Sequence, residues 1–228
     1  ARHRLGALAS RHLQRQRRMG KVAELQSALD ADPMKSNIGI AHTRWATHGV
    51  PSEKNAHPHI SHDGLAIVHN GIIENHEQLR DELKSLGYVF TSDTDTEVIA
   101  HRIHFHLKKT PNLFEAVQAT VHELEGAYAL VVMSEANPGQ LILARCGCPV
   151  VVGLGDNENF VASDVSALLP VTRRFIFLEE GDVAEIHRSH VRVLDKDGKV
   201  THRPVKESEL SADAAEKGQY PHYMLKEI

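Results

Sequence analysis

Three polar clusters in the sequence contain side chains that could bind a substrate or take part in a reaction. Residues 42–49 follow a short apolar segment, residues 68–76 contain an Asn-Gly pair, and residues 92–97 precede a helical pattern of apolar residues. Binding and catalytic groups are often carried by loops next to strands and helices. We therefore treat the three clusters as candidate parts of a single site.

Four residues of these clusters together have the chemistry needed to recognise a free α-amino acid. Arg44 could hold a carboxylate through two parallel hydrogen bonds, and Asp95 at a helix start could pair with an ammonium. Asn70 and the N–H of Gly71 could stabilise the oxyanion that forms when an acyl group is attacked. The residues alone leave an alternative open, in which Asn-Gly forms a turn, Asp95 belongs to a helix cap and Arg44 makes a surface ion pair.

The elements that would position these residues follow from the apolar pattern. Residues 38–41 and 65–68 are typical of short buried strands. The second strand should end at His69-Asn70-Gly71, because Asn-Gly favours turns.

Four helices are predicted, and three of them have a capping signal at their start. One short helix is expected over residues 22–29. The others should begin after Asn75, Thr94 and Asn112, because each is followed three residues later by Gln or Glu, as in a capping box. In the first of these three, one face should be lined by Leu79, Leu83 and Leu86.

From residue 127 onward the pattern changes to alternating or continuous short apolar runs, which predict strands. These strands are expected over residues 127–133, 140–144, 150–154, 160–162, 175–178, 183–187 and 191–194. The succession of strands, helices and many more strands indicates an α/β fold in which two sheets pack together with helices outside.

The composition is typical of one large globular domain, with 228 residues, 41% apolar, 25% charged and a net charge of −4. No apolar run approaches the roughly 18 residues that a membrane-spanning helix needs, so no membrane partner is predicted. The net negative charge argues against nucleic acid as the main partner, and the basic segment 2–21 is interpreted as a solvated stretch.

The cysteines and histidines predict neither disulfides nor a metal. Cys146 and Cys148 are separated by one residue, too close for an unstrained bridge, so a reducing cytoplasm is expected. Most of the 17 histidines are interpreted as solvated surface residues. His57-Pro58-His59 and His104-Phe105-His106 lack further ligands at a spacing typical of metal sites. We therefore predict no metal and no cofactor.

The sequence resembles the class II glutaminase domain of the glutamine–fructose-6-phosphate aminotransferases, also called glucosamine-6-phosphate synthases. The resemblance runs from about Arg18 to Ile228 and is carried by residues 42–49, 70–76, 92–101, 126–128, 162–164, 168–170, 175–182 and 222–224. It implies an N-terminal-nucleophile hydrolase fold, an αββα sandwich with two antiparallel sheets. It also implies hydrolysis of L-glutamine, with the ammonia used to convert fructose 6-phosphate to glucosamine 6-phosphate.

By this resemblance, Arg44 would bind the α-carboxylate of glutamine and Asp95 its α-ammonium, while Asn70 and Gly71 would form the oxyanion hole. Three residues of the first cluster would line the glutamine pocket or gate the passage of ammonia, namely Thr47 and His48 for the pocket and Trp45 for the gate. Trp45 as a core aromatic and His48 as a structural hydrogen-bonding residue remain open alternatives.

The sequence departs from the family at its start. The family's nucleophile is an N-terminal cysteine, whereas this sequence begins Ala1-Arg2-His3. We expect either a fragment or a degenerate domain. Cys146 and Cys148 are internal and lack the terminal amine that the mechanism uses, so we expect them to have packing roles.

The 228-residue chain as written is therefore expected not to hydrolyse glutamine. Loss of the nucleophile of a catalytic unit can lower the rate by a factor on the order of 10⁶. Ammonia release from the purified chain tests this expectation. Release at a rate typical of the family, abolished by thiol alkylation, would assign the reaction to Cys146 or Cys148.

The resemblance also suggests how the chain is divided. Residues 1–36 are a poorly defined N-terminal segment, residues 37–203 the glutaminase core, and residues 204–228 a linker and junction. The junction would lead to a sugar-phosphate isomerase domain that binds fructose 6-phosphate, in a protein expected to be a cytoplasmic homodimer. The alternatives are a degenerate domain that binds glutamine or a partner protein, and a class II glutaminase that serves another acceptor.

Overall fold

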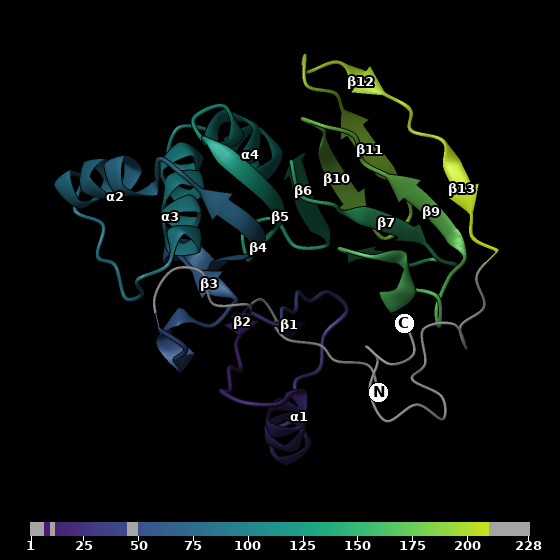
Figure 1. Ribbon diagram of the computed structural model, residues 1–228, viewed down its shortest axis with the longest axis horizontal. Coiled ribbons are helices and arrows are strands. Elements are labelled where there is room, and N and C mark those ends of the chain that lie inside the picture. Colours follow the sequence, from purple (N-terminus) through teal and green to yellow (C-terminus); the bar gives the residue numbers. More distant parts are fainter. Residues whose placement is uncertain (1–6, 10–11, 45–49, 210–228) are drawn as a thin grey trace, which may run out of the picture.

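The computed structural model describes residues 7–9, 12–44 and 50–209 (Figure 1). Its helices are α1 (Val22–Ala31), α2 (His76–Ser85), α3 (Asp95–Leu107) and α4 (Leu113–Val121). Its strands are β1 (Ala7–Ala9), β2 (His12–Gln14), β3 (His59–Ile60), β4 (Leu65–Ile73), β5 (Gly126–Ser134), β6 (Gln140–Cys146), β7 (Val151–Leu154), β8 (Asn159–Ala162), β9 (Arg174–Phe177), β10 (Val183–His187), β11 (Val191–Leu194), β12 (Val200–Thr201) and β13 (Val205–Glu207). In this described part, no helix combines the length and apolarity that a membrane crossing requires.

Two antiparallel sheets form the centre of the fold, as the sequence predicts. The larger has seven strands in the order β12-β11-β10-β6-β5-β4-β3, and the smaller has four in the order β13-β9-β7-β8. β1 and β2 pair separately with each other. Figure 1 shows α2, α3 and α4 grouped beside the β4–β5 end of the larger sheet.

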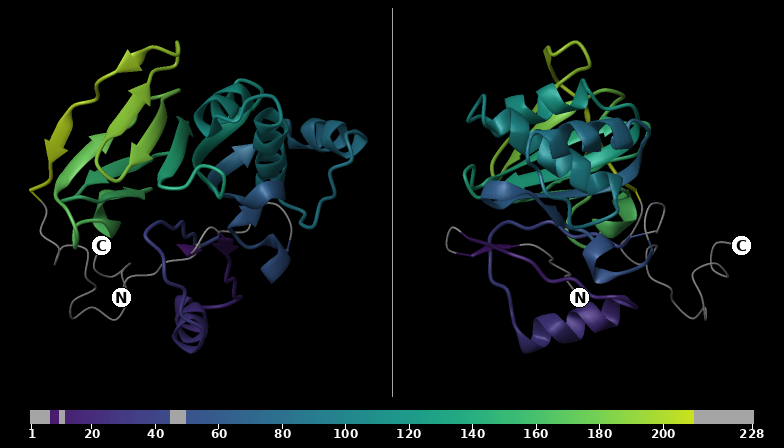
Figure 2. Two further views of the ribbon diagram at one scale, coloured as in Figure 1. Left: turned by 180° about the vertical axis from the view of Figure 1, so that it is seen from behind. Right: turned by 90° about the vertical axis from the view of Figure 1, so that its left-hand side faces the viewer.

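Figure 2 shows the arrangement of the helices and sheets from two further sides, and the hydrophobic core is divided between these layers. One cluster joins α3 and α4 to the larger sheet, with Ile99 and Val117 packed against Ile67 and Leu130. A second cluster fills the space between the sheets and contains residues of β5, β6, β7, β9, β10 and β11. A third lies on the opposite side of the smaller sheet, where the segment 165–171 covers Val151 and Phe175 of β7 and β9. Successive side chains of a strand point to opposite faces of its sheet, so one strand can contribute residues to the core on both sides.

Two predicted strand features are wrong. Residues 38–41 form no continuous strand, because only Gly39 makes an isolated bridge. Ile38 and Ile40 nevertheless pack into a core cluster with β4, so the apolar pattern signalled burial rather than sheet hydrogen bonding. β4 does not end at Asn70-Gly71 but continues to Ile73, because it pairs with β5 along its whole length. This extended pairing overrides the turn preference of Asn-Gly.

All three helices begin at the predicted residues, and the predicted capping bond is present in two of them. Thr94 accepts a hydrogen bond from the Glu97 N–H, and Asn112 accepts bonds from two N–H groups of α4. Asn75 precedes α2 but makes no capping bond. Its side chain bridges instead to the backbone before β5, so tertiary partners replace the predicted local cap.

Some short elements were absent from the prediction or extend past its boundaries. β3, β12 and β13 are too short to give an apolar period. β13 pairs with β9, so three residues of the predicted linker belong to the smaller sheet. Leu86, predicted on the apolar face of α2, is 53% exposed, because α2 ends at Ser85 and the chain turns away at Gly87.

Candidate active site

A cavity of about 310 Å³ lies where the three polar clusters of the sequence meet. It is lined by Arg44 and its neighbours, by Asn70 and Gly71 of β4, and by Asp95 in the first turn of α3. The structure therefore brings together all the sequence-predicted site residues that it describes. Trp45, Thr47 and His48 lie outside the described residues.

Asp95 is held in a fixed position between α3 and β4. It is the first residue of α3 and is only 4% exposed. Its Oδ2 accepts a hydrogen bond of 3.0 Å from the backbone N–H of Ile73 and lies 4.0 Å from Nδ1 of His69. The helix N-terminus and the β4 N–H both place positive partial charge beside this carboxylate. The cavity thus contains a buried negative charge that could receive a cation.

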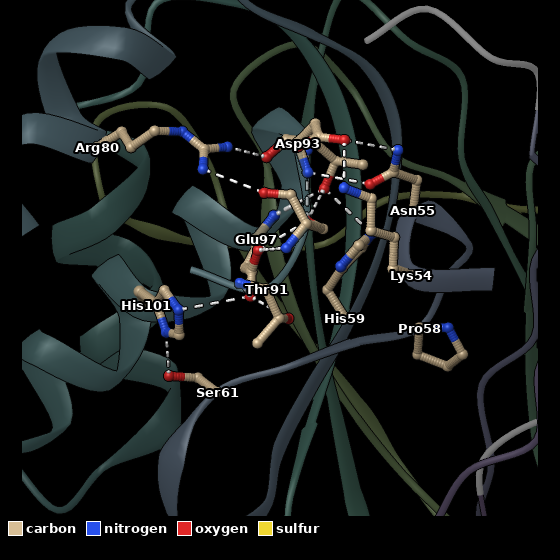
Figure 3. A network of polar contacts seen from close by, with 12 residues as sticks. Lys54, Asn55, Pro58, His59, Ser61, Arg80, Thr91, Asp93, Glu97 and His101 are labelled. Atoms are coloured by element: carbon tan, nitrogen blue, oxygen red, sulfur yellow. Dashed lines mark hydrogen bonds and ion pairs between the residues drawn. The ribbon is translucent and has the colours of Figure 1, made fainter. Parts of the chain in front are cut away.

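The loop before Asp95 is organised by the buried carboxylate of Glu97 (Figure 3). Glu97 accepts hydrogen bonds from the backbone N–H and hydroxyl groups of Thr91 and Ser92, at 2.6–2.9 Å. Burial alone would raise the pKa of Glu97, but these hydrogen bonds lower it below its ordinary value. Arg80 donates to the carbonyl oxygens of Ser92 and Thr94 at 3.2 and 2.7 Å. The first turn of α3 is therefore held by the side chains of Glu97 and Arg80, which do not line the cavity.

The side chain of Asn70 is held by His42, a residue for which the sequence analysis predicts no role. Nε2 of His42 lies 2.8 Å from Oδ1 of Asn70. Burial lowers the pKa of His42, the hydrogen bond to Asn70 partly offsets this effect, and the positive charge of Arg44 lowers the pKa further. His42 is therefore neutral at pH 7.

Gly71 occupies a position that other residues cannot adopt without strain. Its φ is +120°, a value that L-residues with a side chain rarely take. A Cβ built at this position would lie well inside van der Waals contact with the carbonyl oxygen of Ala127 on β5. The absence of a side chain lets β4 approach β5 closely beside the cavity.

A second cavity of about 250 Å³ shares His42, Thr43, His69 and Asn70 with the first. Its remaining lining is largely apolar and comes from β4, β5, β8 and the segment before β7. Asn70 is therefore accessible from two cavities rather than one.

The prediction of mainly solvated histidines is wrong for the histidines around the cavity. His57, His59 and His69 are buried, and His57 Nε2 and His69 Nδ1 each lie 3.1 Å from Oγ1 of Thr96. The rings of His42 and His57 are in contact, with centroids 4.0 Å apart. The sequence held one usable signal, because His69 directly continues the apolar run of β4 and therefore had to be buried.

The buried histidines predict a loss of stability in mild acid. Burial lowers the pKa of His59 and of His101 to about 4, whereas an unfolded histidine has a pKa of about 6.5. Above pH 6.5 both histidines are neutral in the folded and in the unfolded chain, so the free energy of unfolding does not depend on their protonation. Below pH 6.5 the unfolded chain gains protons first, so the free energy of unfolding should fall by roughly 1–2 kcal/mol per histidine between pH 6.5 and 5.

Urea unfolding at pH 7, 6 and 5 measures this effect before most carboxylates titrate. His101→Gln should reduce the pH dependence, whereas His202→Gln should not, because His202 is exposed. A free energy of unfolding that stays constant from pH 7 to pH 5 would contradict the prediction.

Neither a metal nor a reactive thiol is indicated in the described part of the chain. It contains no group of three or more His, Cys, Asp or Glu side chains arranged to hold a metal ion. Cys146 and Cys148 are free thiols that do not line either cavity. Burial raises the pKa of both thiols, and burial together with the neighbouring Glu180 outweighs the positive charge of Arg145, which lowers the pKa. Both increases in pKa reduce the fraction of the reactive thiolate.

Comparison with known proteins identifies the fold and the family. Residues 42–170 match the family described as "Glutamine amidotransferase domain", and this range includes Arg44, Asn70, Gly71 and Asp95. The match covers more than half of the chain. The chain belongs to the glutamine amidotransferase domain family. The cavity described above is therefore a candidate glutamine site.

Curated relatives of this amidotransferase domain are named glutamine–fructose-6-phosphate aminotransferase [isomerizing]. The protein from Shewanella oneidensis is 60% identical over 216 residues, which are 95% of this chain and 36% of that protein. The protein from Escherichia coli is 57% identical over 220 residues, 96% of this chain and 36% of that protein. The chain thus spans about a third of the length of these relatives.

Solved structures confirm the N-terminal-nucleophile amidotransferase fold. Glutamine phosphoribosylpyrophosphate amidotransferase from B. subtilis matches with a TM-score of 0.71 and 26% identity, over 86% of this chain and 43% of that chain. A glutamine aminotransferase class-II domain protein from Silicibacter pomeroyi matches with a TM-score of 0.58 at 15% identity, over 83% of this chain and 89% of that chain. This second likeness supports the fold alone.

Proposed function

We propose that this amidotransferase domain is the glutamine-hydrolysing part of a glutamine–fructose-6-phosphate aminotransferase and binds L-glutamine in the larger cavity. The observation that carries the proposal is the convergence of four groups on one cavity. A guanidinium, a buried carboxylate and a pair of hydrogen-bond donors match the carboxylate, the ammonium and the side-chain carbonyl of glutamine. The names of relatives 57–60% identical to the chain support the same reaction.

The proposed binding mode follows from the chemistry of each group. Arg44 binds the α-carboxylate through its planar guanidinium, and Asp95 pairs with the α-ammonium. Asn70 Nδ2 and the Gly71 N–H donate to the side-chain carbonyl oxygen, and their bonds strengthen as that oxygen becomes negative. The attacking thiolate, which the family resemblance assigns to an N-terminal cysteine, is not among the described residues of the cavity.

The partners of the domain are part of the proposal. The relatives are almost three times as long as this chain, and we propose that the remainder of the natural protein is a sugar-phosphate isomerase domain that binds fructose 6-phosphate. Ammonia released into water would be protonated, so its transfer calls for an enclosed path. We propose that Trp45 gates this path, that Thr47 and His48 line the glutamine pocket, and that the whole protein is a cytoplasmic homodimer.

Arg44→Lys tests the carboxylate site. Lysine keeps the positive charge but cannot form two parallel hydrogen bonds to one carboxylate. Loss of one charge-assisted hydrogen bond costs roughly 1.5–3 kcal/mol, so we expect glutamine binding to weaken by about 10- to 100-fold. Isothermal titration calorimetry with the 228-residue chain measures the change.

Arg174→Lys is the matched control, since Arg174 is exposed on β9 and does not line the cavity. It should leave glutamine affinity unchanged. Equal affinity in the Arg44→Lys variant and the unmodified chain would remove Arg44 from the site.

A further inference from the structure

The side chain of Asn70 can serve an oxyanion hole in only one of its two orientations. Its amide carries a donor, Nδ2, and an acceptor, Oδ1. A half-turn of the amide exchanges these two atoms with little change in shape. With Nδ2 toward the substrate the amide stabilises a developing negative charge, whereas with Oδ1 there it would repel that charge. The site therefore needs a neighbouring group that fixes the orientation of the Asn70 amide.

His42 contacts the acceptor end of this amide. Its Nε2 lies 2.8 Å from Oδ1 of Asn70, so the contact is a hydrogen bond only if Nε2 carries the proton. A neutral imidazole has a single N–H. If the proton were on Nδ1, Nε2 would accept a bond instead and would favour the opposite amide orientation. The tautomer of His42 thus selects the atom that Asn70 presents.

The surroundings of His42 favour the proton on Nε2. Nδ1 is buried and has no hydrogen-bond partner among the described residues. A hydrogen bond to the backbone of His69 also raises the pKa of the ring, but Nδ1 makes no hydrogen bond with the described residues. A buried N–H without an acceptor is rarer in proteins than a buried acceptor without a donor. The single proton therefore has a partner on Nε2 and none on Nδ1.

The ring of His42 is connected to the first turn of α3 through the ring of His57. It packs against the ring of His57 with centroids 4.0 Å apart, and His57 Nε2 lies 3.1 Å from Thr96 Oγ1. Thr96 directly follows Asp95. Asp95 would bind the substrate ammonium, and Asn70 would polarise the substrate carbonyl. These two residues are thus linked through the rings of His42 and His57.

We propose that His42 is a positioning residue that holds the Asn70 amide with Nδ2 toward the cavity. The proposal rests on the proposed function, since it assigns Asn70 to the glutamine carbonyl. His42 itself acts only through Asn70 and does not donate to the substrate carbonyl.

The first test needs no ligand and uses the 228-residue chain labelled with ¹⁵N. Long-range ¹H–¹⁵N correlation spectra at pH 7 report which ring nitrogen of His42 is protonated. We expect the proton on Nε2. A proton on Nδ1 would overturn the proposal, whether or not the chain binds glutamine.

The second test compares two ligands and two substitutions by calorimetry. L-Norvaline keeps the α-amino acid end of glutamine but replaces the side-chain amide by a methyl group. Its affinity should depend on Arg44 and Asp95 but not on Asn70. The preference for glutamine over norvaline therefore isolates the contribution of the carbonyl contact.

His42→Gln and His42→Asn form a matched pair for this comparison. The terminal nitrogen of Gln can reach the place of Nε2, whereas that of Asn is too short to do so. We expect His42→Asn to lower the preference for glutamine by about tenfold, the value of one hydrogen bond, and His42→Gln to retain most of it. Norvaline affinity should change little in both variants.

The outcomes separate this proposal from the proposed function. If the unmodified chain binds neither ligand, the glutamine site fails, and the tautomer measurement still decides the role of His42. If the chain prefers glutamine and both variants keep that preference or both lose it, the positioning role is overturned. Should His42→Asn fail to fold, the tautomer measurement and the His42→Gln variant still decide the question.

Discussion

Asp95→Asn is expected to weaken L-glutamine binding by roughly 30-fold to several thousand-fold. Removing one partner of a buried, hydrogen-bonded charge pair costs about 2–5 kcal/mol. The side chain is 5% exposed, so water cannot replace the lost charge. Asparagine keeps an oxygen that can accept the hydrogen bond from Ile73, so the fold should be preserved.

Asp93→Asn is the control for this experiment. Asp93 lies two residues earlier in the same loop, but its side chain is about half exposed and pairs with Lys54 at 2.9 Å, outside the cavity. Calorimetric titration of both variants, with thermal unfolding to confirm folding, gives the comparison. Similar glutamine affinities for the two variants would show that Asp95 does not bind the ammonium.

Gly71→Ala is expected to lower the free energy of unfolding by roughly 2–5 kcal/mol. A positive φ costs an L-residue about 1–2 kcal/mol, and a side chain forced into a packed region costs about 1–3 kcal/mol further. Both penalties apply, because φ is +120° and the new methyl group would meet the Ala127 carbonyl. Strands β4 and β5 would have to separate beside the cavity, so glutamine binding should be lost as well.

Gly87→Ala separates the two penalties. Gly87 also has a positive φ, of +88°, but nothing lies within 4 Å of a Cβ built there. Its substitution should cost only the conformational part, about 1–2 kcal/mol. Urea unfolding measures both variants. Equal losses at the two positions would mean that the close contact between β4 and β5 contributes nothing.

The sequence was informative where local chemistry decides the structure. Thr94 and Glu97 predicted the start of α3, and this start places Asp95 at the cavity. The alternation of apolar residues after residue 126 predicted seven strands of the two sheets. These features depend on neighbours a few residues away, so a single sequence is enough to reveal them.

The sequence was misleading where distant segments decide the structure. The Asn70-Gly71 dipeptide favours a turn, but pairing with β5 extends the strand through it. His42 and His57 gave no signal of burial, because their contacts with Asn70 and Thr96 span 28 and 39 residues. The structure therefore identified the layer of residues behind the site, which sequence reasoning had missed.

The hydrogen bond between Asp95 and the N–H of Ile73 has a consequence for the length of substrate that the cavity accepts. It ties the start of α3 to the same strand that carries Asn70 and Gly71, three and two residues before Ile73. The separation between the proposed ammonium and carbonyl sites is thus set by the β4 backbone and by the short side chain of Asp95, which is bonded to that backbone. Asparagine, one methylene shorter than glutamine, could not reach both sites at once. Chain-length selectivity in this domain would therefore originate in the link between α3 and β4.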